Sequence, residues 1–420
     1  MTEPTNVVRF RQPDDVDDPL TEVLRAGARR LLAQAVELEA EAFLAARDDL
    51  RLPDGRPRLV RHGHGPERQI QTGIGPVAVS RVKIRDRAGG EARVRFSSAI
   101  LPRWARRTKS LDALLPVLYL RGVSTGDFQE ALAALLGKDA PNLSPSVVGR
   151  LTAEWQVEYE RWQARDLSAR RYLYVWADGV YLQARMEDHA ECMLVLIGAT
   201  PEGKKELVGF QVGIRESAQS WRELLVEAKR RGLVIAPEIA VGDGALGFWK
   251  AIDEVWPGTR HQRCWVHKVA NVLNKVPKSV QPSMKADLRE IYSAPDRAAA
   301  EKAITVFAEK YGVKYAKAAE CLIKDRERLL TFFDFPAEHW DHLRTSNPIE
   351  SVFATVRHRT VRTKGALSSP TARLMVFKLV IAASRTWRRL KGENQLPKLV
   401  AGVRFRDGTE VINGQSTRAA

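Results

Sequence analysis

Between residues 171 and 265 the chain alternates strand-like and helix-like runs, and this alternation limits its fold more than any other feature. The runs RYLYVWA, VYLQARM, ECMLVLIGA and ELVGFQVGI are rich in β-branched and aromatic residues and predict successive strands. They are followed by a predicted helix in SAQSWRELLVEAKRRG, a strand in EIAVGDG and a helix in GALGFWKAIDEVW. A chain with this pattern is expected to form an α/β domain around one sheet.

Three carboxylates stand where these elements end or begin. Asp178 follows YLYVWA, Asp243 follows EIAVG, and Glu350 lies in TSNPIES, where a helix is expected to start. Two Asp and one Glu supply the hard oxygen ligands that suit Mg²⁺. Two such ions roughly 3.5–4 Å apart stabilise the attacking and leaving oxygens of a phosphodiester displacement. If the fold brings the acids together, they predict a nuclease or strand-transfer enzyme with two Mg²⁺ ions, for which Mn²⁺ can substitute.

Each acid also has an ordinary structural interpretation. Asp178 precedes a glycine, and an Asp-Gly pair between apolar runs favours a type I′ hairpin turn. Asp243 precedes a predicted helix, in the position of an N-cap. Asn347 is placed as an N-cap with Pro348 as the first helical residue, so Glu350 occupies the third position of a capping box. Taken one at a time, the acids therefore do not establish a metal site.

The charge of the chain favours a polyanionic partner. Its 67 Lys and Arg residues outnumber 51 Asp and Glu, which gives a formal net charge of +16. Phosphates neutralised by Lys or Arg release condensed counterions, so double-stranded DNA is the leading candidate, and a basic surface that serves only solubility is the alternative. Residues 344–406 contain fourteen Lys and Arg but only two acids, which predicts a DNA-binding track. Its candidate contacts are Arg357, Arg359, Arg362 and Lys364.

The cysteines indicate a reducing compartment. Cys192, Cys264 and Cys321 are odd in number and widely spaced, which argues against a disulfide framework and favours a cytoplasmic location. Neither a signal peptide nor a membrane span is expected. Cys264 and His267 have half of a zinc-site spacing without a second half nearby, so the pattern favours a buried Cys beside a hydrogen-bonded His.

Composition and periodicity divide the chain into eight segments. The helical pieces around Gly122 and Gly137 are compatible with a helix-turn-helix reader of DNA and equally with any small helical bundle. The predicted segments are a disordered acidic lead (1–18), an N-terminal helix (19–50), a small β-rich basic module (51–108), a helical, helix-turn-helix-like DNA-binding region (109–168), the α/β core (169–265), a helical insertion (266–342), C-terminal helices that carry Glu350 (343–392) and a basic, flexible tail (393–420).

Six runs occur in one order along most of the chain, and their combination is far more specific than any single run. They are LYLRGVSTGDF, WADGVY, GKKELVGFQVGIRESAQSW, RGL followed by VGDGALGFWKAI, RHQRCWVHKVANVL, and TSNPIESVFATVRHRT. Through these runs the chain resembles bacterial insertion-sequence transposases of the mutator type, a DDE group with an RNase H-like catalytic domain. The resemblance extends from Leu20 to about Leu390.

The resemblance implies an α/β RNase H-like catalytic domain with an all-α insertion, preceded by a helical and small β-rich DNA-binding region. It implies that Asp178, Asp243 and Glu350 are the three metal-binding acids, and that Cys264 and His267 belong to a signature near the catalytic centre. It also implies binding to the terminal inverted repeats of the element, transfer of 3′-OH ends to target DNA, and at least a dimer on DNA, because two DNA ends must be paired.

The sequence departs from the family pattern at two places. The usual Asp-Ala after the first strand is Asp178-Gly179 here, and the segment at His189 is locally different. The residues leave two other functions open. One is a non-catalytic DNA-binding regulator derived from a transposase, and the other is an RNase H-like nuclease without strand transfer.

Overall fold

The computed structural model describes residues 19–88, 93–111, 118, 145–182, 191–213, 215–244, 247–350, 352–354, 356 and 369–411. The chain divides into two compact units, Met1–Leu151 and Thr152–Ala420. Residues 1–18 and 119–144 lie outside the described ranges. The disordered lead and the helix-turn-helix therefore stay predictions.

In the first unit a long helix packs on short antiparallel strand pairs. The helix is α1 (Pro19–Ala45), and the pairs are β1 (Leu59–His64) with β4 (Val82–Asp86) and β2 (Arg68–Thr72) with β3 (Gly75–Val79). Val36 and Ala40 of the helix join apolar strand residues in a small core. The guanidinium of Arg58 donates two hydrogen bonds of 2.9 Å to the carboxylate of Asp86, which ties the start of β1 to the end of β4.

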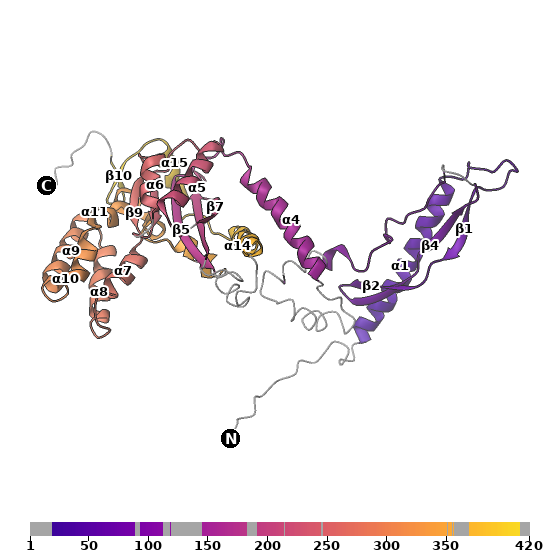
Figure 1. Cartoon of the computed structure of the whole chain (residues 1–420), viewed down its shortest axis with the longest axis horizontal. Helices are drawn as coiled ribbons and strands as arrows, with labels where there is room; N and C mark the ends of the chain where they lie inside the picture. The colour runs from indigo at the N-terminus through magenta and orange to yellow at the C-terminus, as the bar shows by residue number, and fades with distance from the viewer. Residues whose placement is uncertain are drawn as a thin grey trace, which may run out of the picture. The chain divides into compact units, whose positions relative to one another are not determined.

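The second unit is built around a five-stranded mixed sheet (Figure 1). Its strands are β5 (Tyr174–Leu182), β6 (Glu191–Ala199), β7 (Lys205–Gly213), β8 (Ile239–Gly242) and β9 (Arg260–Arg263). The order is β7-β6-β5-β8-β9, with β6 antiparallel to both of its neighbours and β8 parallel to both of its neighbours. The predicted mixed α/β core is therefore present, and β9 adds a strand that the sequence did not indicate.

Helices cover both faces of this sheet. On one face α5 (Ala218–Arg230) and α6 (Phe248–Val255) pack against alternate strand residues such as Val175 and Ala177. On the other face the indole of Trp176 donates a 2.9 Å hydrogen bond to the carbonyl of His342. Because successive strand residues point to opposite faces, Asp178 projects on the same side as Trp176.

Residues 265–343 form the predicted helical insertion, which appears in orange in Figure 1. Its elements are α7 (Trp265–Leu273), α8 (Gln281–Tyr292), α9 (Arg297–Gly312), α10 (Ala316–Ile323), α11 (Arg326–Leu329), two 3₁₀ turns (Thr331–Asp334 and Ala337–His339) and α12 (Trp340–Leu343). Within the described ranges, no helix is both long enough and apolar enough to cross a membrane.

The C-terminal part is more ordered than the sequence predicts. After helical residues 347–350 come α14 (Ser369–Ser384), a 3₁₀ turn (Glu393–Gln395), α15 (Leu396–Val400) and the hairpin of β10 (Phe405–Arg406) with β11 (Thr409–Glu410). The expectation of a flexible tail is wrong for 393–411, because Leu396 is fully buried and the carboxylate of Asp407 accepts a 2.8 Å hydrogen bond from the backbone of Arg297.

The structural roles that the local sequence suggests for the three acids differ from those in the structure. The hairpin turn at Asp178 and the helix cap at Asp243 are wrong, and the position of Glu350 in its helix changes by one residue. Asp178 is not in a turn, because β5 pairs with β6 without interruption through Asp178↔Val195. Asp243 does not cap a helix, because α6 begins five residues later, after Gly247. The last helix begins at residue 347, so Ser346 takes the N-cap place predicted for Asn347, and Glu350 is the fourth helical residue.

Candidate active site

The parallel register of β5 and β8 brings two of the predicted acids to neighbouring positions. Ala177 pairs with Gly242, and the next residues along the two strands are Asp178 and Asp243. Asp178 is still a residue of β5, whereas Asp243 is the first residue after the end of β8. Asp178 is 8% exposed and accepts a 2.9 Å hydrogen bond from the backbone N–H of Gly179. The predicted adjacency of the two strands is thus confirmed.

Ser346 links the third acid to the first turn of α7. Its backbone N–H donates to Sγ of Cys264 at 3.2 Å, and its hydroxyl donates to Oε1 of Glu350 at 3.0 Å. The same hydroxyl lies 3.5 Å from Nδ1 of His267. A backbone hydrogen bond of 2.8 Å from Trp265 to Arg344 holds the two segments together. The Cys264-His267 signature and Glu350 therefore meet although more than eighty residues separate them along the chain.

The charges of the three acids act on one another. The pKa of Asp178 is raised to about 6: burial contributes most, the negative charges of Glu350 and Asp243 act in the same direction, and His267 opposes the shift. Like charges held close together in a buried place disfavour ionisation. Glu350 and Asp243 therefore both act electrostatically on the carboxylate of Asp178.

His267 is the cationic counterpart of this group. Its hydrogen bond with Cys264 raises its pKa to about 9, and the negative charges of Asp243 and Asp178 act in the same direction against burial. The imidazole is therefore protonated at neutral pH. A protonated His is a hydrogen-bond donor at both ring nitrogens and suits contact with a phosphate oxygen.

The donor chemistry distinguishes two groups that share Glu350. The oxygens of Asp178, Asp243 and Glu350 suit Mg²⁺ or Mn²⁺. Cys264, His267 and Glu350, whose ligand atoms lie within 4.8 Å of one another, have the sulfur and nitrogen donors that favour Zn²⁺. Cys264, however, already has hydrogen-bond partners in Ser346 and His267. We therefore interpret the Cys-His pair as hydrogen-bonded and the three acids as the residues that fit a divalent cation.

Glu216 is a fourth carboxylate at this place, and the sequence pattern did not single it out. A Cβ atom at Gly179 would lie 2.9 Å from Cγ and Cδ of Glu216, so the glutamate side chain occupies the space beside that backbone. The pKa of Glu216 is raised to about 7, mainly by burial and also by the negative charges of Asp178 and Asp243. The signal that marked the other acids was also present here, because Glu216 stands between β7 and α5, one residue before the N-cap Ser217.

The other predicted contacts fall outside the part of the chain that the structure describes. Arg357, Arg359, Arg362 and Lys364 lie in the stretch 357–368, and His189 lies in 183–190. The role of the four basic residues in binding DNA stays a prediction, and so does the local departure from the family pattern at His189.

Comparison with known proteins identifies the relatives of the chain. The family described as "Transposase, Mutator family" matches residues 1–389. The transposase for insertion sequence element IS6120 of Mycolicibacterium smegmatis is 49% identical over 298 residues, which are 71% of this chain and 92% of that protein. The transposase for element IST2 of Acidithiobacillus ferrooxidans is 52% identical over 287 residues, 67% of this chain and 95% of that protein. The transposase for element ISRM3 of Rhizobium meliloti is 29% identical over 390 residues, 91% of this chain and 92% of that protein.

Proposed function

The chain belongs to the mutator family of transposases, and from this we propose that it binds the terminal inverted repeats of an insertion sequence, cleaves phosphodiesters there and transfers the 3′-OH ends to target DNA. The substrate is double-stranded DNA at both steps. Two element ends must be held at once, so the working form is a homodimer or a larger assembly on DNA. Its place of action would be the bacterial cytoplasm, at the nucleoid.

The observation that carries this proposal is the pairing of Ala177 with Gly242. Asp178 and Asp243 each follow one member of this pair, and the negative charges of Asp243 and Glu350 both act on the carboxylate of Asp178, which supports a shared site for the three acids. The strand order β7-β6-β5-β8-β9, in which the chain's third, second and first strands precede its fourth and fifth, supports the RNase H-like fold that the family resemblance implies.

Each residue has a distinct part in the proposed reaction. Asp178, Asp243 and Glu350 would hold two Mg²⁺ ions, and Mn²⁺ would substitute. Such ions lower the pKa of an attacking water or hydroxyl and stabilise the leaving 3′-oxygen. His267, protonated at neutral pH, donates to a phosphate oxygen of the bound strand. Ser346 fixes the orientation of Glu350 through its hydroxyl.

The test uses purified protein, Mg²⁺ and labelled duplex DNA that carries the repeats flanking the gene. Wild-type protein should nick the repeat end and join it to a second DNA, and Asp243→Asn should abolish both steps while leaving binding intact. The matched control is Asp253→Asn, which removes an exposed aspartate that lies on α6 and pairs with His261.

Three results separate the functions that the sequence left open. Nicking with joining that depends on Asp243 supports the transposase. Nicking without joining supports a nuclease, and binding without nicking supports a regulator; either of these results would overturn the proposal.

A further inference from the structure

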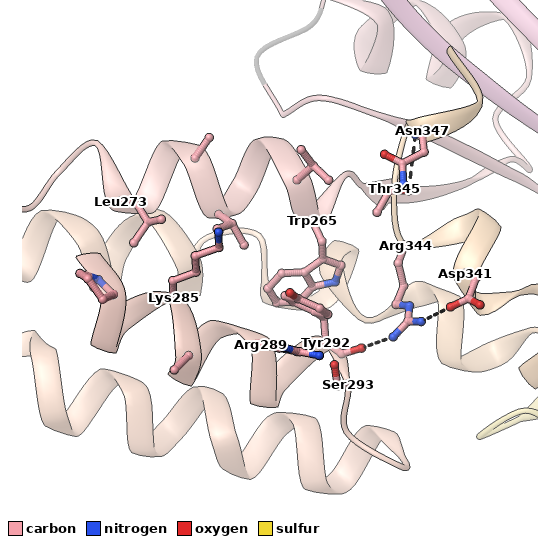
Figure 2. A pocket seen from close by; sticks show the side chains of 15 residues that line it. Trp265, Leu273, Lys285, Arg289, Tyr292, Ser293, Asp341, Arg344, Thr345 and Asn347 are labelled. Carbon is pink, nitrogen blue, oxygen red and sulfur yellow. Dashed lines mark hydrogen bonds and ion pairs between the residues drawn. The ribbon is translucent and has the colours of Figure 1, made fainter. Parts of the chain in front are cut away.

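A groove of about 980 Å³ runs between α7 and α8 beside the proposed active site (Figure 2). One wall is α7 and the other is α8, and the end nearest the sheet is closed by residues 344–347. Arg344 fixes this end, because its guanidinium donates to the carbonyl of Tyr292 at 2.6 Å and pairs with Asp341. The groove therefore has a defined shape at the end that adjoins the site.

The groove and the active site share two walls. In the segment 345–347, Thr345 and Asn347 line the groove, whereas Ser346 between them bonds to Glu350. On α7, Val266 lines the groove, while its neighbour His267 belongs to the site. A molecule that lies in the groove would thus be separated from Glu350 by a single layer of residues.

The α7 wall is apolar. Val266, Val269, Ala270 and Leu273 follow the i, i+3, i+4, i+7 spacing of one helix face. Val266 is 44% exposed, so this face lacks the cover that apolar helix faces normally have in a folded chain. The opposite side of α7 is occupied, because Lys268 and Val272 are buried against neighbouring elements. The exposed stripe is available for the flat face of an apolar group.

The α8 wall carries positive charge. Lys285 and Arg289 are exposed, stand one helical turn apart, and within the described ranges have no side-chain hydrogen bond or ion pair. The other charges that line the groove, Arg344 and Asp341, neutralise each other. The groove therefore combines an apolar wall with two unneutralised cations, which is the pattern of a site that stacks bases and holds phosphates.

We propose that this groove binds unpaired nucleotides of the DNA strand that is held at the active site. The bases lie on the α7 stripe and the half-buried Tyr292, and the phosphates contact Lys285 and Arg289. A cavity of this size holds a drug-sized molecule, which corresponds to about one or two nucleotides. A duplex buries a far larger protein surface than the groove offers. This inference rests on the proposed function, because it assigns a place to the strand next to the cut.

The test measures binding of the full-length protein to two DNAs without divalent cation, so that no cleavage occurs. One DNA is a blunt duplex, and the other is the same duplex with a three-nucleotide single-stranded extension that contains 2-aminopurine. Wild-type protein should bind the extended DNA more tightly, and 2-aminopurine fluorescence should fall as the base stacks.

The variant Lys285→Ala/Arg289→Ala removes both cations of the groove. It should bind the extended DNA about tenfold more weakly and reduce the slope of log affinity against log salt by about one to two, because each phosphate that is no longer neutralised keeps roughly one bound counterion. Its binding to blunt DNA should equal that of wild type. The control Lys302→Ala/Lys317→Ala makes the same change in charge on exposed positions of α9 and α10. It should bind both DNAs as wild type does.

A second variant, Ala270→Leu, narrows the groove at an exposed position without changing charge. It should abolish the 2-aminopurine response and leave binding to blunt duplex unchanged. Equal binding of both DNAs by wild type, or equal losses in the two double variants, would overturn the proposal. So would an altered oligomeric state of Ala270→Leu with normal binding of the extension, because the groove would then hold a second copy of the chain.

The proposal that the groove binds nucleotides and the proposal of transposase activity can be refuted independently. Asp243→Asn should bind the extension as wild type does. Cleavage and joining without any preference for the extension would refute the groove alone, whereas stacking of the extension by a protein that does not cleave would refute the transposase alone.

Discussion

The side chain of Glu216 lies against the backbone of Gly179, the residue that follows Asp178. Strand alternation puts Gly179 on the α5 side of β5 and Asp178 on the other side. The pairing of β5 with β8 ends at Ala177. Beyond this point the carboxylate of Glu216 interacts electrostatically with both Asp178 and Asp243. A residue with a side chain at 179 would displace the glutamate. The glycine that departs from the family pattern thus makes room for a fourth acid.

We therefore expect Glu216→Gln to weaken divalent-cation binding by about tenfold, because carboxylates that orient the water or ligands around a metal typically contribute that much or more. Calorimetric titration of Mn²⁺ into the DNA-free protein measures this directly. Glu223→Gln is the control, since Glu223 is an exposed acid on α5 that bonds to Gln219. Equal Mn²⁺ affinity in wild type and Glu216→Gln would exclude a role of Glu216 at the cation site.

Asp178 should reduce the stability of the cation-free protein at neutral pH. Its pKa of about 6 in the folded state exceeds the ordinary aspartate value of 3.8, so between these values the folded chain holds a proton that the unfolded chain has released. Folding stability accordingly falls as pH rises through this window, and the loss is complete above about pH 6. The difference between a pKa of 3.8 and one of about 6 corresponds to about 3 kcal/mol of unfolding free energy.

Asp178→Asn removes this titration. Its free energy of unfolding relative to wild type should increase by up to about 3 kcal/mol between pH 4 and pH 8, as measured by urea denaturation without divalent cation. Mg²⁺ should stabilise the wild type and leave Asp178→Asn unaffected. A difference between the two proteins that is the same at both pH values would contradict the assigned pKa.

His267 should set the upper pH limit of cleavage. Because its pKa is raised to about 9, its positive charge is present at neutral pH and is lost as pH rises through 9. Cleavage of repeat DNA should fall over that range. His267→Ala should lower the cleavage rate by about a hundredfold at about pH 7.5, which is in the range seen when a charge-stabilising donor is removed. The decline in rate near pH 9 should also disappear in this variant.

Two further variants test the cause of the shift. His267→Lys should move the decline in cleavage rate to higher pH, because the ordinary pKa of lysine is about 10.4. Cys264→Ala removes the hydrogen bond that contributes most to the raised pKa of His267, and it should move the decline in cleavage rate to lower pH. If the cleavage rate declines at the same pH in all three variants, a group other than His267 causes the decline.

The sequence predicts the sheet well because runs of apolar and β-branched residues determine which segments are strands. It predicts strand ends less well. The Asp178-Gly179 pair has the local signature of a turn, yet all nine residues of β5 pair with β6, and the tertiary pairing outweighs the turn propensity. The strand β9 was missed for a related reason. RHQR is polar, and it becomes a strand because β8 supplies a parallel partner.

The sequence singles out three acids as candidates, but it does not show what surrounds them. Asp178, Asp243 and Glu350 stand out by position in the sequence. Glu216 joins them only through contacts between distant segments, such as the 3.0 Å hydrogen bond from the backbone of Gly247 to its carbonyl. Local patterns do not encode contacts of this kind.

A buried ion pair should hold the helix that carries His267. Lys268 of α7 is 4% exposed, and its ammonium donates to the carboxylate of Asp325 at 2.5 Å and to the carbonyl of Cys321 at 2.9 Å. Removing Lys268 leaves the buried carboxylate of Asp325 with only its longer ion pair to Arg263, at 3.7 Å, so Lys268→Ala should cost about 3 kcal/mol of unfolding free energy. Lys268→Met combined with Asp325→Leu should cost less than the sum of the single changes, because neither member of the Lys268–Asp325 pair is then left without the other, although Arg263 still loses its carboxylate partner.

The control for this pair is Lys310→Ala, which breaks the half-exposed pair of Lys310 with Asp287 and should cost about 1 kcal/mol or less. Urea denaturation of each variant measures the differences. Since α7 also carries the apolar wall of the groove, the loss in Lys268→Ala should extend to binding of the single-stranded extension. If Lys268→Ala and Lys310→Ala are equally stable, the hydrophobic residues of α7, such as Trp265 and Val272, fix the helix, and its ion pair contributes little.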